Sequence, residues 1–232
     1  MNGSPPRWEA ILLAAGASRR MGAPKALLPW SGRRLLEHQV LEILATRVSR
    51  VVVVLGAHRE QLLPLVERGV RTLGGSFQGG SRLAWVMNAD WPSGKCSSIR
   101  CGAGAVSPRS DHILLAAVDQ PLAAEVLEAI FAAHERAGRA ITIPRVGGRR
   151  GHPVAVRALL VDELKRLSEE REGLRYLVRE AERKGELNEV EIAAEPVLWN
   201  LNRPDQIPGR ARPAGGARGT EVLWWVREQP LP

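Results

Sequence analysis

The residues best suited to chemistry lie near the start of the chain, in Leu12–Pro29, which reads L-L-A-A-G-A-S-R-R-M-G-A-P-K-A-L-L-P. Small residues around Gly16 let a ligand approach the backbone closely, because little side chain stands in the way. Ser18, Arg19, Arg20 and Lys25 add one hydroxyl group and three cations, two guanidinium groups and an ammonium. Free backbone N–H groups together with such cations are what binds a triphosphate. The segment therefore predicts a phosphate-binding loop, although its spacing fits neither the P-loop nor the G-x-G-x-x-G pattern.

A second chemical group, Asp119, follows the apolar run H-I-L-L-A-A-V and precedes Gln-Pro. A carboxylate at the end of a buried strand suits Mg²⁺, which uses one or two carboxylates and often substrate phosphates as ligands. Such a cation neutralises charge during transfer from a triphosphate. An Asp before Gln-Pro also makes a good turn or helix cap. Beside the phosphate-binding loop we favour the metal-binding role.

The first segment resembles the signature of nucleotidyltransferases with one Rossmann-like domain, the MobA-like NTP transferases. Their pattern is L-A-x-G-x-S-x-R-M-G-x-x-K, and the matching positions are Leu13, Ala14, Gly16, Ser18, Arg20, Met21, Gly22 and Lys25. Members transfer a nucleoside monophosphate from an NTP onto a phosphate. The resemblance implies catalytic roles for Arg20, Lys25 and Asp119. It implies nucleotide binding by Leu13, Ala14, Ala15, Gly16, Ser18, Arg20 and Lys25.

Two short turns resemble the metal-binding elements of that family. V-D-Q-P-L matches its D-x-P turn, with Asp119 in the metal position. The segment N-L-N-R-P-D resembles its closing N/D-I-N/D-T-P-E-D, which gives Asn202 as a second metal ligand, while Arg203 replaces the usual Thr. The implied cofactor is Mg²⁺. Because an amide is neutral, metal affinity would depend mainly on Asp119 and the phosphates.

Two further segments resemble the molybdenum cofactor cytidylyltransferases within this family. Asn88–Gly102 follows their N-x-x-W-x-x-G-x-x-S-S pattern, which implies that Asn88 and Ser97 contact the nucleotide. The G-H-P of residues 151–153 resembles their acceptor-side loop, which implies acceptor binding by Arg150 and His152. The pair Ala14-Ala15 is also typical of the cytidylyl branch, whereas the guanylyl branch tends to carry a second glycine there.

The implied reaction is direct transfer of CMP from CTP to molybdenum cofactor, with release of pyrophosphate. A molybdenum hydroxylase that receives the product is an implied partner. Three alternatives remain open: a guanylyl or sugar-phosphate nucleotidylyltransferase of the same fold, a non-catalytic nucleotide or cofactor carrier, and a basic nucleic-acid binder. Lys25 and Asp119 argue against the carrier.

Composition bears on the remaining classes of protein. The net charge is +8, but the arginines are scattered and only two Phe and one Tyr occur, which disfavours a nucleic-acid binder. No apolar run is long enough for a membrane span, and residues 1–9 lack the apolar region of a secretory signal. Two cysteines are too few for a disulfide framework. The expectation is a cytoplasmic protein that binds neither membranes nor nucleic acid.

Strand-like and helix-like stretches alternate along the chain, which predicts an α/β fold: one doubly wound, mostly parallel, Rossmann-like sheet of the GT-A type. Strands are expected at residues 8–15, 50–55, 112–118, 140–144, 154–156 and 189–192. Helices are expected at 35–45, 59–67, 96–105 and 123–137, and one or two helices at 161–183. We expect one domain over residues 1–207 and a Pro-, Gly- and Arg-rich tail over 208–232, with a possible docking segment at 222–226. Residues 72–82 are expected to form a mobile loop. Ligands bind at the carboxyl ends of strands in such sheets.

Overall fold

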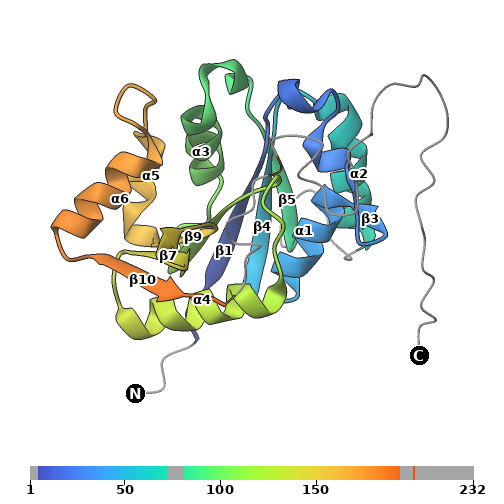
Figure 1. Cartoon of the computed structure of the whole chain (residues 1–232). Coiled ribbons are helices and arrows are strands. Elements are labelled where there is room, and N and C mark those ends of the chain that lie inside the picture. Colours follow the sequence, from blue (N-terminus) through green and yellow to red (C-terminus); the bar gives the residue numbers. More distant parts are fainter. Residues whose placement is uncertain (1–4, 73–80, 194–200, 202–232) are drawn as a thin grey trace, which may run out of the picture.

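A mixed sheet forms the centre of the computed structural model, which describes residues 5–72, 81–193 and 201 (Figure 1). The strand order is β10-β7-β9-β6-β1-β4-β5, and β8 pairs with β7. The strands are β1 (Trp8–Ala14), β4 (Val48–Leu55), β5 (Leu83–Met87), β6 (His112–Ala117), β7 (Ile141–Val146), β8 (Arg149–Arg150), β9 (Val154–Arg157) and β10 (Leu187–Glu191). A separate hairpin pairs β2 (Pro29–Trp30) with β3 (Arg33–Arg34).

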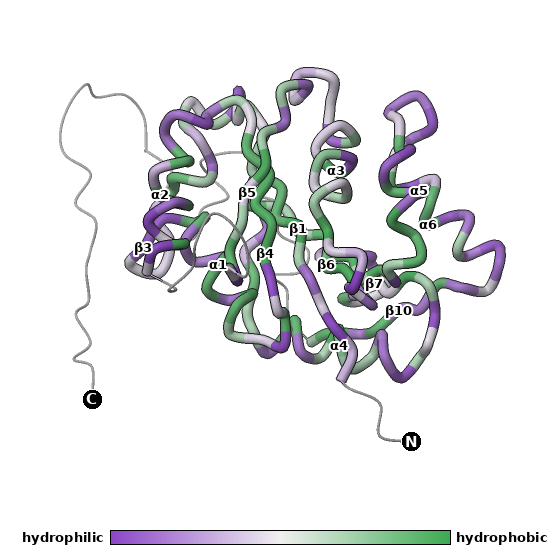
Figure 2. The backbone as a smooth tube through the Cα atoms, turned by 180° about the vertical axis from the view of Figure 1, so that it is seen from behind, coloured by the Kyte–Doolittle hydropathy of each residue, from purple (hydrophilic) through white to green (hydrophobic). Residues whose placement is uncertain are grey.

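Strand β1 lies at the middle of the sheet, parallel to β4 on one side and to β6 on the other. Leu13 pairs with Val54 in β4 and with Ala117 in β6. Continuous apolar sequence is what a parallel strand covered on both faces requires. Figure 2 shows hydrophobic residues along the central strands and hydrophilic ones concentrated in the outer helices and loops. Because β1, β4 and β6 run parallel to one another, their carboxyl ends meet at one edge of the sheet.

Helices cover both faces of the sheet, and successive β1 side chains point to opposite faces. Ala10, Leu12 and Ala14 face a core that includes α1 (Leu35–Leu44), α2 (Arg59–Thr72) and α4 (Ala124–Ala137). Ile11, Leu13 and Ala15 face a second core that includes α3 (Lys95–Gly104), α5 (Val161–Lys165) and α6 (Leu174–Arg183). This two-sided burial is the doubly wound α/β architecture (Figure 1).

The predicted fold class is confirmed, and most predicted elements lie within a few residues of the observed ones. Helix α2 continues to Thr72, so its predicted end at Glu67 was wrong. Strand β5 was missed because its residues are only partly buried at the sheet edge. Strand β9 is antiparallel to both β6 and β7, which sequence periodicity cannot reveal. The region 161–183 forms two helices, α5 and α6.

Several sequence predictions fall on residues that the structure does not describe. These are the tail at 208–232 with its segment 222–226, the greater part of the predicted loop at 72–82, and Asn202. Within the described ranges, none of the helices combines the length and the apolar character needed to cross a bilayer.

Helix α3 approaches the sheet closely enough to require glycine at one position but not at another, which yields a stability prediction. A Cβ on Gly102 would lie 2.4 Å from Ile11 Cγ2 and 3.0 Å from Val54 Cγ2, whereas one on Gly104 would meet nothing within 4 Å. Gly102→Ala should therefore lower the free energy of unfolding by about 1–3 kcal/mol through overpacking. Gly104→Ala should leave it unchanged or raise it by up to about 1 kcal/mol. Urea denaturation of both variants checks this, and equal effects would contradict the close approach.

Candidate active site

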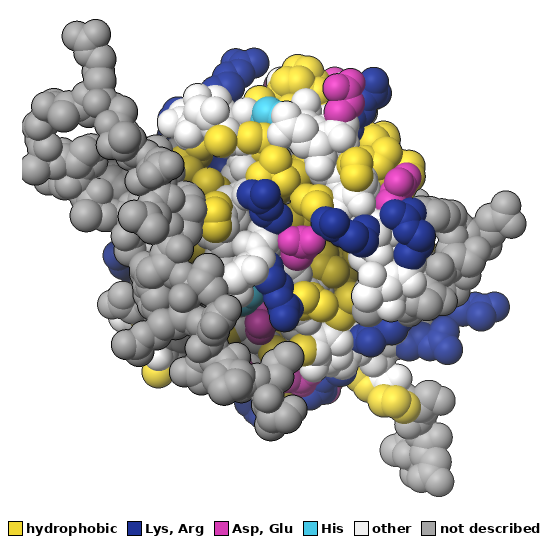
Figure 3. Space-filling model, turned by 90° about the vertical axis from the view of Figure 1, so that its right-hand side faces the viewer, with side chains coloured by type: hydrophobic (Ala, Val, Ile, Leu, Met, Phe, Trp, Pro, Cys, Tyr) yellow, Lys and Arg dark blue, Asp and Glu magenta, His cyan; other side chains and the backbone are white. Residues whose placement is uncertain are grey.

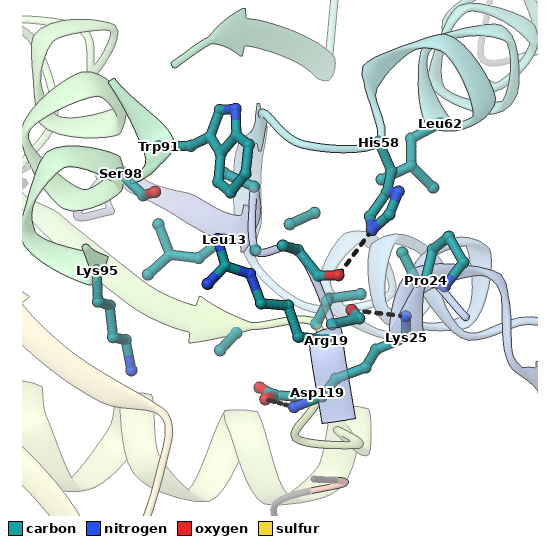
Figure 4. Close-up of a pocket in the computed structure, with 18 of the residues that line it drawn as sticks. Leu13, Arg19, Pro24, Lys25, His58, Leu62, Trp91, Lys95, Ser98 and Asp119 are labelled. Carbon is teal, nitrogen blue, oxygen red and sulfur yellow. Dashed lines mark hydrogen bonds and ion pairs between the residues drawn. The ribbon is translucent and has the colours of Figure 1, made fainter. Parts of the chain in front are cut away.

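The carboxyl ends of β1, β4 and β6 surround an open cavity of about 530 Å³ (Figure 4). Its wall comes from the loop after β1, the start of η2 (Lys25–Leu27), the N-terminal half of α2, residues 91–98 and the turn after β6. Parallel pairing alone brings these segments together, because each follows a strand that ends at the same edge. Segments some 100 residues apart in sequence thus share one site.

The loop after β1 is held by hydrogen bonds to its carbonyl oxygens. Ala15 O accepts a bond of 3.0 Å from the Ala57 N–H, and Ala17 O accepts one of 3.0 Å from His58 Nε2. Among the described residues, no hydrogen bond uses the amide N–H of Gly16, Ala17 or Ser18. Ser18 has the left-handed backbone conformation, with φ of 51°. The loop is therefore fixed through its acceptors, and its donors stay available to an anion.

Lys25 joins the two motifs that the sequence analysis singled out. Its N–H donates to Ser18 Oγ at 3.0 Å, and its Nζ forms an ion pair of 2.7 Å with Asp119 Oδ2. Both side chains are mostly shielded, at 13% and 22% exposure for Lys25 and Asp119. The main-chain carbonyl of Asp119 accepts a hydrogen bond from the Leu201 N–H at 2.9 Å. The predicted phosphate-binding lysine and metal-binding carboxylate therefore lie side by side.

The two arginines of the loop belong to η1 (Arg19–Met21), and both line the cavity. Figure 4 shows the Arg19 side chain extending across the cavity toward Leu13. The residue types predicted both Arg19 and Arg20 as cations for a triphosphate, whereas the family pattern specifies only Arg20. The structure offers both guanidinium groups to a ligand.

Asn88 and Ser97 lie beside the cavity and bond to each other. Asn88 Nδ2 donates to Ser97 Oγ at 2.8 Å and to Ser98 Oγ at 3.0 Å, and Asn88 is 5% exposed. Of these three residues, Ser98 lines the main cavity, whereas Asn88 lines a neighbouring hollow of about 380 Å³. His58 and Trp91 border both spaces. Asn88 thus ties the end of β5 to the start of α3, and its predicted nucleotide contact stays a prediction.

Arg150 and His152, the predicted acceptor residues, have different surroundings. Arg150 forms ion pairs with Glu182 and Glu189, and its hydrogen bonds to them raise the pKa of the guanidinium. His152 belongs to a small hollow that also includes Lys95 and Gln120. Burial, with a smaller contribution from Lys95, lowers the pKa of His152 to about 4. Arg150 is therefore engaged on the protein itself, and His152 is a neutral group near pH 7.

The cavity residues that were not among the predicted site residues include His58, Trp91, Lys95 and Gln120. The position of Lys95 could have indicated a functional role from the sequence. It is the first residue of α3, where a cation is disfavoured because that end of a helix is positive. His58 reaches the cavity only through tertiary structure, whereas Gln120 directly follows the predicted metal ligand Asp119 in the sequence.

Asp119 could contribute to a metal site, but its predicted partner, Asn202, lies outside the described residues. Among the residues that the structure does describe, no three His, Cys, Asp or Glu side chains gather as a metal cluster would. Basic side chains occur at separate places on the face shown in Figure 3, interspersed with hydrophobic ones.

The family is established by comparison with known proteins. Residues 10–186 match the model of the MobA-like NTP transferase domain, and the chain belongs to this family. The matched range includes the phosphate-binding loop, Lys25 and Asp119.

The names of individual relatives of this chain state different activities. The nicotine blue oxidoreductase of Paenarthrobacter nicotinovorans is 36% identical over 157 residues, which are 64% of this chain and 70% of the relative. The bifunctional protein GlmU of Mycobacterium marinum is 32% identical over 137 residues, which are 57% of this chain but only 26% of that longer protein. Family membership is therefore compatible with more than one activity.

Solved structures share the fold. A nucleotidyl transferase from Methanothermobacter has a TM-score of 0.68 at 25% identity, covering 86% of this chain and 94% of its own. Rv0371c from Mycobacterium tuberculosis, solved in complex with manganese, has a TM-score of 0.57 at 21% identity, covering 82% and 89% of the two chains. The confirmed architecture is thus that of known nucleotidyltransferases.

The partly buried position of His152 predicts a pH dependence. Its pKa is about 4 in the folded protein against 6.5 ordinarily. Between these values the unfolded chain binds a proton that the native protein does not, so stability falls as the pH falls from 6.5 toward 4. The full loss is on the order of 3 kcal/mol. We expect the His152 ring signals in NMR to stay constant from pH 8 to 5.5.

The matched variant is His152→Gln, which removes the titrating group. Its free energy of unfolding should decrease less than that of the wild type between pH 7 and pH 5. An equal decrease in both proteins, or titration of His152 near pH 6.5, would contradict the assignment.

Proposed function

We propose that the protein transfers CMP from CTP to the phosphate of molybdenum cofactor and releases pyrophosphate. The observation that carries the proposal is the convergence of the Gly16 loop, Lys25 and Asp119 in one cavity at the carboxyl edge of the sheet. Membership of the MobA-like NTP transferase family supports the reaction class. The cytidylyl preference and the acceptor rest on the resemblance of residues 14–15, 88–102 and 151–153 to the cytidylyltransferase branch.

Triphosphate binding follows from the groups that the loop leaves available. The amide donors of residues 16–18 and the guanidinium groups of Arg19 and Arg20 suit the phosphates. The ion pair between Lys25 and Asp119 must open when substrate binds. The Lys25 ammonium would then neutralise the triphosphate, and the Asp119 carboxylate would become free for a cation.

The residues present fit a divalent cation, and we propose Mg²⁺. Asp119 supplies one carboxylate at the cavity wall, and Asn202 is the predicted second ligand. Mg²⁺ is commonly held by one or two carboxylates together with substrate phosphates, so a single carboxylate in a triphosphate cavity is sufficient. When bound, the ion would neutralise charge on the phosphates of donor and acceptor. The manganese complex of Rv0371c shows that a protein of this fold binds a divalent metal.

The proposed chemistry is a single in-line displacement. An oxygen of the acceptor phosphate attacks the α-phosphorus of CTP, the bond between the α-phosphorus and the bridging oxygen to the β-phosphorus breaks, and pyrophosphate leaves. No nucleophilic side chain of the enzyme is required. The contribution of the chain is to align the two phosphates and to stabilise charge with Arg20 and Lys25. A molybdenum hydroxylase is the partner proposed to receive the product.

A second candidate is an oxidoreductase acting through a bound nucleotide cofactor. The specific observation in its favour is the 36% identity to nicotine blue oxidoreductase. The two candidates differ in what is consumed. Transfer releases pyrophosphate from an NTP, whereas oxidation of NADH or NADPH with nicotine blue would lower absorbance at the nicotinamide wavelength without pyrophosphate.

The first functional prediction concerns Lys25 and Asp119. Lys25→Ala should lower turnover by roughly two to three orders of magnitude, because loss of one preorganised charged contact costs about 3–4 kcal/mol at a transition state. Asp119→Ala should abolish metal-dependent transfer. Pyrophosphate release with CTP, Mg²⁺ and molybdenum cofactor is the measurement.

Lys165→Ala is a matched control, because Lys165 pairs with Asp162 on an exposed part of α5. It should keep wild-type turnover. Near-normal activity of Lys25→Ala would remove that residue from the triphosphate site. Unchanged metal dependence in Asp119→Ala would remove that carboxylate from the metal site.

The second functional prediction concerns the choice of base. The Ala15 side chain is 2% exposed, so its methyl group shapes the turn more than it touches a ligand. Gly56 lies against it, since a Cβ on Gly56 would be 2.7 Å from Ala15 O. Ala15→Gly should loosen this turn and reduce the ratio of kcat/KM for CTP to that for GTP. The proposed catalytic residues Arg20, Lys25 and Asp119 are unchanged in this variant, so activity itself should persist.

The measurement is kcat/KM for CTP and GTP in the wild type and the variant. A wild-type preference for GTP would overturn the cytidylyl assignment and leave the transferase assignment intact. Absence of pyrophosphate release with every NTP, together with nicotinamide oxidation, would favour the oxidoreductase.

A further inference from the structure

Lys95 enters the cavity from the side away from Lys25 (Figure 4). It is the first residue of α3, and no acidic residue stands in the first turn of that helix. No hydrogen bond or ion pair joins Lys95 Nζ to another of the described residues. The Glu169 carboxylate accepts the Cys96 N–H at 2.7 Å and so compensates the positive end of the helix, but it forms no ion pair with the Lys95 ammonium. An anion in the cavity would supply that ammonium with a partner.

Gln120 supplies a second and independent observation. The residue is 5% exposed, and its Oε1 atom is buried without a hydrogen-bond partner among the described residues. A buried acceptor that stays unpaired destabilises the native state, and native proteins leave few of them. The Gln120 side chain lines the same cavity, directly after Asp119. A rotation of the Gln120 side chain into the cavity would let a ligand N–H or O–H group satisfy this acceptor.

Lys95 and Gln120 border one part of the cavity together. They line both the main space and the small hollow that contains His152. His152 is neutral, so Lys95 is the cation available there. Arg150, the cation expected from sequence at the acceptor side, is held by Glu182 and Glu189. The positive charge of this subsite therefore comes from α3 rather than from β8.

We propose that Lys95 and Gln120 form the acceptor subsite: Lys95 binds the acceptor phosphate, and Gln120 Oε1 accepts a hydrogen bond from the acceptor's organic part. The ligand class is a phosphate monoester whose organic part carries an N–H or O–H donor close to the phosphate. This deepens the proposed function, on which it rests in placing the nucleotide at the Gly16 loop. An acceptor phosphate beside Lys95 would lie in the same cavity as Lys25 and Asp119, where transfer is proposed to occur.

The test measures acceptor binding separately from transfer. Protein saturated with Mg²⁺ and a non-hydrolysable CTP analogue is titrated in a calorimeter with molybdenum cofactor, with two sugar phosphates and with inorganic phosphate. Lys95→Met should weaken binding of every phosphate that the wild type binds by at least tenfold, while affinity for the CTP analogue changes less than twofold. Lys165→Met removes the same charge from an exposed position and should change neither affinity.

Gln120→Leu separates the two contacts. It should weaken binding of the organic phosphates at least fivefold and leave the affinity for inorganic phosphate unchanged. Because the replaced oxygen is unpaired in the free protein, the Tm of this variant should stay constant or rise. A purely structural Gln120 would instead show a lowered Tm with unchanged acceptor affinity, which would overturn its role.

The outcomes distinguish this subsite from the proposed function. Acceptor affinity within twofold of wild type in Lys95→Met, or an equal loss of nucleotide affinity, overturns the subsite. A wild type that binds the CTP analogue but no phosphate monoester also overturns it. Lys95-dependent binding of a monoester without any transfer from CTP supports the subsite and refutes the proposed reaction.

Discussion

The parallel pairing of β1 with both β4 and β6 is the constraint on which the site depends. Because both pairings are parallel, the three strands run in the same direction and their carboxyl ends lie at the same edge of the sheet. The segments that follow these strands must therefore lie together. Burial of β1 on both faces leaves the strand no alternative register, because a shift by one residue would exchange the side chains that face the two cores. The position of the Gly16 loop relative to Asp119 is therefore set by packing far from any ligand.

At this edge of the sheet, the ion pair between Lys25 and Asp119 balances the two charges at the proposed phosphate site. Without the ammonium, a shielded carboxylate would stand close to the place where phosphates are proposed to bind. Without the carboxylate, the lysine would have one less partner to fix its side chain. Substrate and cation together would replace both halves of the pair. Binding of either component alone would leave one charge uncompensated, which favours their joint arrival.

The sequence predicts those parts of the fold and site that depend on local pattern. Apolar runs identify β1, β4 and β6, and the spacing of Gly16, Ser18 and Lys25 identifies the loop. What it misses depends on contacts between distant segments. The periodicity of the sequence does not indicate that β9 runs antiparallel to its neighbours β6 and β7. Glu182 and Glu189 engage Arg150 from α6 and β10, and the bonds from Asn88 to two serines form only when β5 meets α3.

The place of β9 between β6 and β7 has a consequence for synthesis of the chain. Strand β6 is complete at Ala117, but the neighbour that covers its outer edge ends only at Arg157, about 40 residues later. At translation rates of roughly 5–20 residues per second, that edge stays open on the ribosome for about 2–8 seconds. An apolar strand with unpaired backbone groups is a template for intermolecular pairing. The nascent protein therefore passes through an interval in which chaperone protection matters most, before the second half of the sheet is made.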